Sequence, residues 1–176
     1  MGREFSGSAR GIVVLDKTIN RSLAGLRKPL SVKAAELITI LGSGPLCLTV
    51  YAFLLLFCRE ACRTLIYAVA TAEIFELSVI IPLRHVVKRE RPQPHPARGI
   101  FTGWNRYSFP SLHASRVCML TIVVGAHWPE ATPYMLAGAV VIGFTRMFLE
   151  KHYLSDVLAG AAVGGIVAAA ALSLNA

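Results

Sequence analysis

Long apolar stretches separated by short polar ones run along most of the chain and predict membrane-spanning helices. A span needs about 20 predominantly apolar residues, and five segments have this pattern, namely 34–57, 64–83, 112–128, 131–149 and 154–174. The connections at 58–63 and 129–130 leave room only for tight turns, so successive helices run antiparallel. Because an open sheet cannot pair its backbone groups in lipid, the predicted fold is all-α, an integral membrane bundle of about five transmembrane helices.

The first 33 residues have a different pattern, with apolar residues at intervals of three or four and basic residues between them. The apolar positions are Ile12, Leu15, Ile19, Leu23, Leu26 and Leu30, and the basic ones are Lys17, Arg21 and Lys28. This pattern predicts an amphipathic helix that lies in the headgroup region instead of crossing the bilayer. We therefore expect a single membrane domain, residues 1–176, with an interfacial segment at 1–33 and a transmembrane bundle at 34–176.

Composition and charge agree with a membrane protein and exclude other classes. Hydrophobic residues make up 55% of the chain and charged residues 16%, whereas soluble domains carry about 25% charged residues. The net charge of +8 is typical of a nucleic-acid binder, but the apolar surface is too large to bury in one small core. We expect no nucleic-acid partner. High hydrophobicity excludes a disordered protein, and four cysteines are too few for a disulfide-stapled module.

Two polar junctions between the predicted spans, at 84–111 and 146–156, lie on the same membrane face of an antiparallel bundle. The amphipathic segment joins them there. The polar residues gathered on this face are Arg84, Lys88, Arg91, Ser111, His113, Arg146, His152 and Asp156. Three arginines with two histidines and a carboxylate form a pocket for a doubly charged oxyanion, with groups for acid-base chemistry beside it. The aromatic residues Phe101, Trp104 and Tyr107 of the first junction suit a loop at the membrane interface.

Three segments of these junctions resemble, in order and spacing, the signature of the type 2 phosphatidic-acid phosphatase superfamily, which includes membrane lipid phosphatases and vanadium haloperoxidases. They are Arg84-x6-Arg91-Pro92, Pro110-Ser111-Leu112-His113 and Thr145-Arg146-x5-His152-x3-Asp156. The resemblance runs from about residue 84 to the C-terminus. It implies a helical membrane phosphatase that hydrolyses lipid phosphates through a phosphohistidine at His152.

The chain departs from the family pattern at three positions. Arg84 stands where the family has lysine and keeps the positive charge, and Thr145 replaces serine and keeps the hydroxyl. Leu112 replaces a glycine whose backbone N–H approaches the phosphate in the family. Since leucine disfavours the backbone conformations that glycine allows, Leu112 preserves this contact only in a helical conformation.

The residue types themselves point to the same reaction. His152 and Asp156 are four residues apart at the start of the last span, so the carboxylate can accept a hydrogen bond from one ring nitrogen and leave the other free to attack phosphorus. His113 is placed to protonate the leaving group. The phosphate-binding groups are Arg84, Arg91 and Arg146, with Ser111 and Leu112 at the start of the third span. No metal or other cofactor is required.

Other functions fit parts of the pattern. A family member without turnover would act as an anionic-lipid-binding scaffold. A small proton-coupled transporter would use Glu73 and Glu76, which lie inside the second span, although pairing with polar groups of neighbouring helices is the simpler role for these acids. A zinc site at His113, His152 and Asp156 would bring fewer carboxylates than such phosphatase sites usually have.

The expected partners are the bilayer and an amphiphilic substrate whose phosphate lies at the headgroup plane. The resemblance implies phosphatidic acid, phosphatidylglycerol phosphate, a polyprenyl phosphate or diphosphate, a polyprenyl-linked sugar phosphate or the lipid A phosphate. We expect an integral multi-pass protein of a bacterial cell membrane. Sixteen Lys and Arg lie on the predicted catalytic face and only Arg59 and Arg63 on the other, which favours a cytoplasmic catalytic face, although many bacterial relatives face the periplasm.

Overall fold

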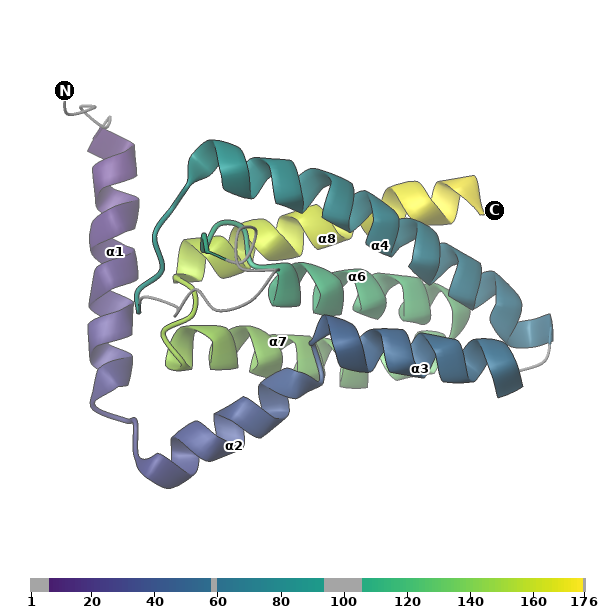
Figure 1. Cartoon of the computed structure of the whole chain (residues 1–176), viewed down its shortest axis with the longest axis horizontal. Coiled ribbons are helices and arrows are strands. Elements are labelled where there is room, and N and C mark those ends of the chain that lie inside the picture. The colour runs from purple at the N-terminus through teal and green to yellow at the C-terminus, as the bar shows by residue number, and fades with distance from the viewer. Residues whose placement is uncertain (1–6, 58–59, 94–105, 176) are drawn as a thin grey trace.

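The structure, a computed structural model, describes residues 7–57, 60–93 and 106–175 and contains only helices and loops in these ranges. The helices are α1 (Gly7–Ala24), α2 (Pro29–Ile40), α3 (Gly44–Phe57), α4 (Glu60–Val87), α6 (Leu112–His127), the short 3₁₀ helix η1 (Pro129–Ala131), α7 (Thr132–Phe148) and α8 (Leu154–Leu174). Helices α3, α4, α6, α7 and α8 lie alongside one another as a bundle (Figure 1). The predicted all-α membrane bundle is confirmed.

The apolar segments predicted from the sequence are all helical. Three helical stretches, Cys62–Val87, Pro129–Phe148 and Leu154–Leu174, are long and apolar enough to cross a membrane, and α2 with α3 forms a fourth if the bent pair is one span. Helix α6 is apolar but has only 16 residues. The chain is therefore a multi-pass membrane protein.

The first predicted span is not a single helix. Helices α2 and α3 are separated at residues 41–43 and bent by 40°. Gly42 and Pro45 explain the break, because proline has no backbone N–H and clashes with the preceding turn inside a helix, so it is tolerated only in the first turn of α3. The prediction of one uninterrupted helix over 34–57 was wrong, and the break lies beside the cavity described below.

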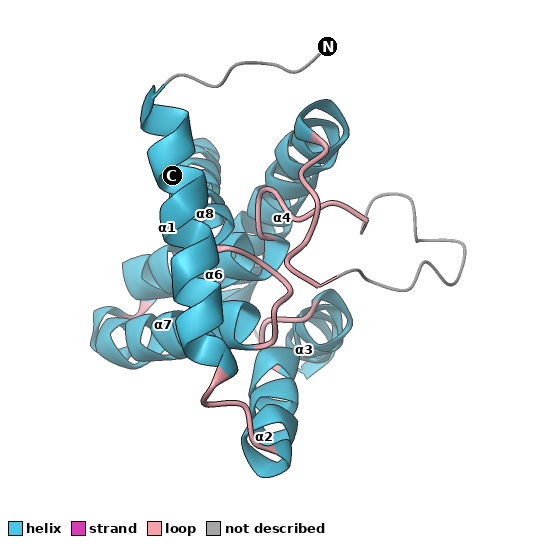
Figure 2. Cartoon of the chain, turned by 90° about the vertical axis from the view of Figure 1, so that its left-hand side faces the viewer, coloured by secondary structure: helices cyan, strands magenta, loops and turns pink. Residues whose placement is uncertain are grey.

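Helix α1 lies across one end of the bundle (Figures 1 and 2). It ends at Ala24, earlier than the predicted pattern, because Gly25 follows and Pro29 begins α2. Its apolar residues Ile12, Val14 and Leu15 are exposed, whereas Asp16 and Asn20 are buried against the protein. This arrangement leaves an apolar surface on α1 free to contact lipid. The interfacial position of α1 remains a prediction.

Helices α4, α6 and α8 share the main apolar core. Its buried side chains are Leu65, Ala68, Val69, Ala72, Met119, Val123, Val167, Ala168 and Ala171. Helix α8 approaches α6 so closely that a Cβ atom at Gly160 would meet the carbonyl oxygen of Ser111, and one at Gly164 that of Ser115. The approach sets the first turn of α6 beside the first turn of α8, where the Ser111 N–H donates to the Asp156 carbonyl at 3.0 Å.

Helix α4 continues one turn beyond its predicted end at residue 83 and places Arg84 in its last turn. Lys88 then has a φ of 50°, in the left-handed region. This conformation ends the helix and turns the chain back toward the bundle. As a result, Arg89 and Arg91 lie against the segment between α7 and α8.

Candidate active site

A cavity of about 1000 Å³ lies within the bundle and has two chemically different parts. The polar part is lined by Arg84, Arg91, His113, Arg146, Lys151 and His152. The other part runs between α3 and α4 and is lined mostly by apolar residues, among them Leu48, Ala52, Leu55, Ile66, Ile74 and Leu77. Since it joins a cationic end to an apolar one, the cavity suits an anionic amphiphile.

His152 lies at the polar end and is almost completely buried, with 1% of its surface exposed. Its Nδ1 atom lies 2.7 Å from the carbonyl oxygen of Ser108, and its Nε2 atom lies 3.3 Å from Nη1 of Arg91. A carbonyl only accepts hydrogen bonds and a guanidinium only donates them. The proton of the neutral ring is therefore on Nδ1, and the lone pair is on Nε2.

The charge state of His152 is set by its surroundings. Burial lowers its pKa well below the ordinary value, and the positive charges of Arg146, Arg91 and Arg84 lower it further. The ring is thus neutral at neutral pH. A neutral imidazole whose lone pair faces a cationic pocket has the protonation state that a nucleophile requires.

Asp156, which is fully buried, does not make the hydrogen bond expected with His152. Its Oδ2 atom lies 3.8 Å from Nδ1 of His152 and instead accepts from the N–H of Tyr153 at 2.9 Å. Its Oδ1 atom accepts from Nη1 of Arg89 at 2.7 Å. The spacing of four residues did place the two side chains near each other, but the Ser108 carbonyl takes the Nδ1 proton because it comes closer.

The three predicted phosphate-binding arginines are buried together around the polar end of the cavity. Arg84 donates to the carbonyl of Pro110 from two nitrogens, at 3.2 and 3.0 Å. Arg91 donates to the carbonyl of Lys151 at 2.8 Å. Backbone carbonyls therefore orient these two groups without neutralising their charge.

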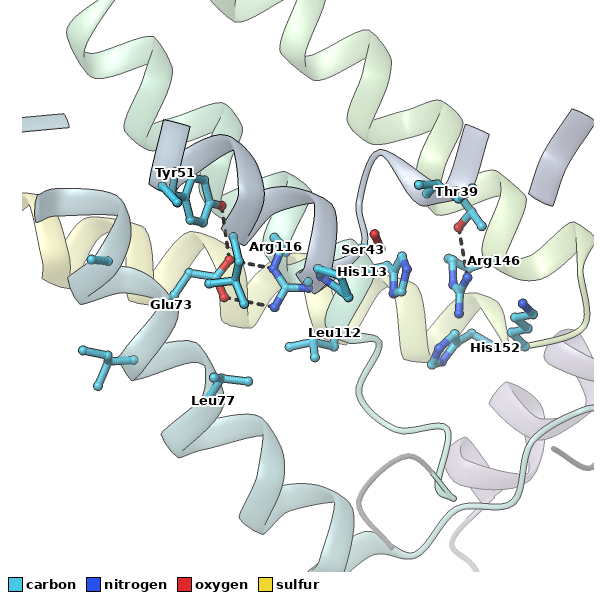
Figure 3. Close-up of a pocket in the computed structure, with 18 of the residues that line it drawn as sticks. Thr39, Ser43, Tyr51, Glu73, Leu77, Leu112, His113, Arg116, Arg146 and His152 are labelled. Atoms are coloured by element: carbon cyan, nitrogen blue, oxygen red, sulfur yellow. Dashed lines mark hydrogen bonds and ion pairs between the residues drawn. The ribbon is translucent and has the colours of Figure 1, made fainter. Parts of the chain in front are cut away.

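Arg146 is oriented by a residue of α2. Its Nη1 donates to Oγ1 of Thr39 at 2.9 Å, and Figure 3 shows its guanidinium between Thr39 and His152. Its Nε atom is buried without a hydrogen-bond partner in the described part of the chain. A buried charged donor of this kind is costly unless a ligand uses it, so Arg146 is suited to bind an anion in the cavity.

The second motif forms the start of α6. Ser111 is its N-cap, and its hydroxyl accepts from the N–H of Ala114 at 3.5 Å. Leu112 is the first helical residue and is not among the residues with positive φ. Its backbone is thus compatible with leucine, and the first N–H groups of the helix have no intrahelical partners. Leu112 and His113 both line the cavity.

Glu73 and Glu76, the acids inside the second span, both lie near Arg116 of α6. Glu73 accepts from Nε and Nη2 of Arg116 at 2.6 and 3.0 Å and from the hydroxyl of Tyr51 at 3.2 Å. Glu76 lies 3.5 Å from Nη2 of the same arginine. The expectation that these acids meet polar groups of neighbouring helices is confirmed, and the cluster joins α3, α4 and α6 (Figure 3).

Several contributors to the site were not predicted. They are Thr39, Lys151, the Ser108 carbonyl, Arg89 and Asp16. Two of the predicted interfacial aromatic residues, Phe101 and Trp104, lie outside the described residues. In residues 7–57, 60–93 and 106–175, no three His, Cys, Asp or Glu side chains come together as a metal site requires, so this geometry gives no support to the zinc alternative.

Comparison with known proteins identifies similar sequences. The sequence model of the PAP2 superfamily matches residues 61–176. The decaprenylphosphoryl-5-phosphoribose phosphatase of Mycobacterium tuberculosis is 30% identical over 93 residues, which are 52% of this chain and 51% of that protein. The lipid A 1-phosphatase of Rhizobium etli is 33% identical over 89 residues, 47% of this chain and 38% of that protein. The chain spans about half the length, or less, of these curated relatives.

Two crystal structures share the fold over most of their length. A transmembrane PAP2-type phosphatidylglycerolphosphate phosphatase from Bacillus subtilis superimposes with a TM-score of 0.72 at 19% identity, over 97% of this chain and 87% of that chain. Aquifex aeolicus LpxE superimposes with a TM-score of 0.69 at 22% identity, over 90% of this chain and 95% of that chain. At these identities the likeness establishes the fold.

Proposed function

Because this chain belongs to the PAP2 superfamily, we propose that it is a membrane phosphatase that hydrolyses a lipid phosphate without a metal, through a phosphohistidine on His152. The observation that carries the proposal is the state of His152. Its Nδ1 is bound to the Ser108 carbonyl, and its Nε2 faces a cavity lined by Arg84, Arg91 and Arg146. The cavity continues into an apolar groove that suits a lipid tail.

The first step is the attack of Nε2 of His152 on phosphorus. An N–P bond forms as the P–O bond to the lipid breaks, and the leaving oxygen takes a proton from the imidazolium of His113. In this proposal His113 takes up its proton together with the substrate, because the negative charge of the bound phosphate offsets the positive charge of the neighbouring arginines. Arg84, Arg91 and Arg146 stabilise the charge on the equatorial oxygens.

The second step returns the enzyme to its starting state. His113, now neutral, takes a proton from water while the water oxygen attacks phosphorus and the N–P bond breaks. Inorganic phosphate leaves, and the lone pair returns to Nε2 of His152. Nδ1 keeps its proton throughout, because the Ser108 carbonyl accepts a hydrogen bond from it in every state.

The substrate class follows from the shape of the cavity. The phosphate lies at the polar end and the lipid tail in the apolar groove between α3 and α4. A substrate without a tail leaves this groove empty and binds with less energy. The relatives act, by their names, on decaprenylphosphoryl-5-phosphoribose, lipid A and phosphatidylglycerol phosphate. These lipids, together with phosphatidic acid and polyprenyl diphosphate, form the panel of candidates.

The experiment is phosphate release from this panel by the purified protein in detergent, with excess EDTA and with His152→Ala as the inactive control. Release that survives EDTA and disappears in the variant supports the proposal. No release from any lipid would favour the anionic-lipid-binding scaffold, which predicts binding without turnover. Release that EDTA abolishes would show that a metal takes part.

We propose that the catalytic end of the bundle faces the cytoplasm, because Lys and Arg are concentrated at that end. Lys17 of α1 and Glu130 of η1 are exposed. Helix α1 lies across one end of the bundle, and the turn between α6 and α7, which contains η1, lies at the other end. Lys17 and Glu130 are each replaced by cysteine in a background whose native cysteines are alanine. In intact cells a membrane-impermeant maleimide should label Glu130→Cys and leave Lys17→Cys unlabelled; the reverse pattern would place the catalytic end outside.

A further inference from the structure

A buried carboxylate of α1 contacts the start of α8, although α1 lies outside the residues that match the family model. Asp16 is 2% exposed. Its Oδ1 accepts from the backbone N–H of Ser155 at 3.0 Å, and its Oδ2 accepts from the Ser155 hydroxyl at 2.5 Å. Ser155 is the second residue of α8, three residues after His152. Asp16 therefore caps α8 from another helix and holds the point at which that helix begins.

Arg89 connects Asp16 to both neighbours of the His152 ring. Its Nη2 donates to Asp16 at 2.6 Å and its Nη1 donates to Asp156 at 2.7 Å. Its backbone carbonyl accepts from the N–H of Ser108 at 2.8 Å, and the Ser108 carbonyl in turn accepts from Nδ1 of His152. One residue thus places the carbonyl and the carboxylate that lie on the Nδ1 side of the ring.

A second contact from the N-terminal segment holds the other side of the same loop. Arg27, between α1 and α2, donates from Nε to the carbonyl of Phe148 at 2.7 Å. It also forms an ion pair with Glu150 at 2.7 Å. Glu150 has a φ of 53°, in the left-handed region, so the ion pair holds the turn that leads to His152. The N-terminal segment therefore contacts the chain on both sides of His152.

We infer that Asp16 is a positioning residue for His152, acting through Arg89 and the first turn of α8, so that α1 belongs to the active site as well as to the membrane surface. The inference rests on the proposed role of His152 as nucleophile. Two buried carboxylates, Asp16 and Asp156, share the guanidinium of Arg89. Asp16→Asn removes this charge and leaves Arg89 paired with one carboxylate only. Its single amide oxygen can still accept from the Ser155 N–H, but the NH2 group that replaces the other oxygen cannot accept from Arg89.

The test compares Asp16→Asn with Glu130→Gln, which makes the same change of carboxylate to amide at an exposed site at the other end of the bundle. Asp16→Asn should lower kcat by about tenfold, as expected when a hydrogen bond between charged groups is lost, with KM within about twofold of wild type. Glu130→Gln should leave both constants unchanged. Equal kinetics in the two variants would overturn the inference.

A double variant separates positioning from general stability. If Asp16 acts through Arg89, adding Asp16→Asn to Arg89→Gln should lower kcat little beyond Arg89→Gln alone. Effects that multiply would show that Asp16 does not act through Arg89. Should Asp16→Asn fail to fold, Asp16→Glu replaces it. That variant keeps the charge but moves the carboxylate by one methylene, and it should keep the unfolding temperature of wild type and still lose kcat.

A readout without turnover distinguishes this inference from the proposed function. The rate at which diethyl pyrocarbonate modifies His152, measured by peptide mass spectrometry, reports access to Nε2 and its protonation. Asp16→Asn should raise this rate severalfold and Glu130→Gln should not. If the wild-type protein releases no phosphate and Asp16→Asn still speeds the modification of His152, the positioning role holds and the proposed function is rejected. An unchanged rate would reject the positioning role in an active enzyme.

Discussion

His152 donates a hydrogen bond from Nδ1 to the backbone carbonyl of Ser108 at 2.7 Å. A main-chain group, and not the carboxylate of Asp156, therefore determines which ring nitrogen carries the proton. Because a carbonyl has no charge, it fixes the tautomer without stabilising the imidazolium as strongly as a carboxylate would. The ring stays neutral, and Nε2 keeps its lone pair among three arginines.

The first prediction concerns the titration of His152. Burial, then Arg146, Arg91 and Arg84, lower its pKa well below 6.5, so the ring should stay neutral as pH falls from 8 to 6. Its C2 proton, assigned with His152→Ala, should show no NMR titration step near pH 6.5. Replacing Arg91 by glutamine removes a positive neighbour. This should raise the pKa of His152 and move its titration to a higher pH. A wild-type step near pH 6.5 would contradict this electrostatic account.

The second prediction concerns Thr39, whose hydroxyl orients Arg146. Thr39→Val keeps the shape of the side chain but removes the acceptor, and it should lower kcat/KM by about tenfold, as expected for a lost hydrogen bond to a charged group. Thr39→Ser keeps the hydroxyl and serves as the control. Steady-state kinetics of the two variants provide the test. If Thr39→Val and Thr39→Ser have the same kcat/KM, the hydroxyl does not orient Arg146.

The third prediction concerns the backbone N–H of Leu112, at the first position of α6. Proline is tolerated there, and the preceding Ser111 already has the extended conformation that a following proline requires. Leu112→Pro thus removes one donor, and if that donor binds the transferred phosphate, kcat should fall about a hundredfold. Leu112→Ala, which keeps the N–H, should retain most of the wild-type kcat. Equal activity in the two variants would show that the N–H takes no part.

The sequence predicted the bundle well because each span is apolar over most of its length, and lipid permits little besides helices for such segments. Motif spacing also brought His113, Arg146 and His152 to one cavity. The break between α2 and α3 was missed. The apolar run continues through Leu41 and Leu46, while Gly42 and Pro45 were the signal that could have located the break.

The contacts that orient the site could not be predicted in the same way. Ser108 acts through its carbonyl, which every residue possesses. Asp16 contacts Ser155 across 139 positions of sequence, and no local pattern encodes such a pairing. Asp16 is the only acid in α1, and this was the one available signal, because a carboxylate on the protein-facing side of a helix needs a buried partner.

The fourth prediction concerns the buried pair of Glu73 and Arg116, whose side chains are 12% and 5% exposed. Glu73→Leu leaves Arg116 without its main partner and should cost about 3 kcal/mol of unfolding free energy in detergent. The double variant Glu73→Leu/Arg116→Leu replaces both charges by apolar groups and should be more stable than the single one. A single variant as stable as wild type would show that the pair does not brace the helices.

Trapping the phosphorylated intermediate shows whether His152 attacks phosphorus. Wild-type protein is mixed with an active lipid phosphate labelled with ³²P, quenched with alkali within one turnover, and digested for peptide mapping. We expect an acid-labile, alkali-stable phosphoryl group on the peptide that contains His152, formed at a rate no slower than kcat. His113→Ala should form it more slowly, and His152→Ala not at all. Full turnover by His152→Ala, or label on any other residue at that rate, would show that His152 is not the nucleophile.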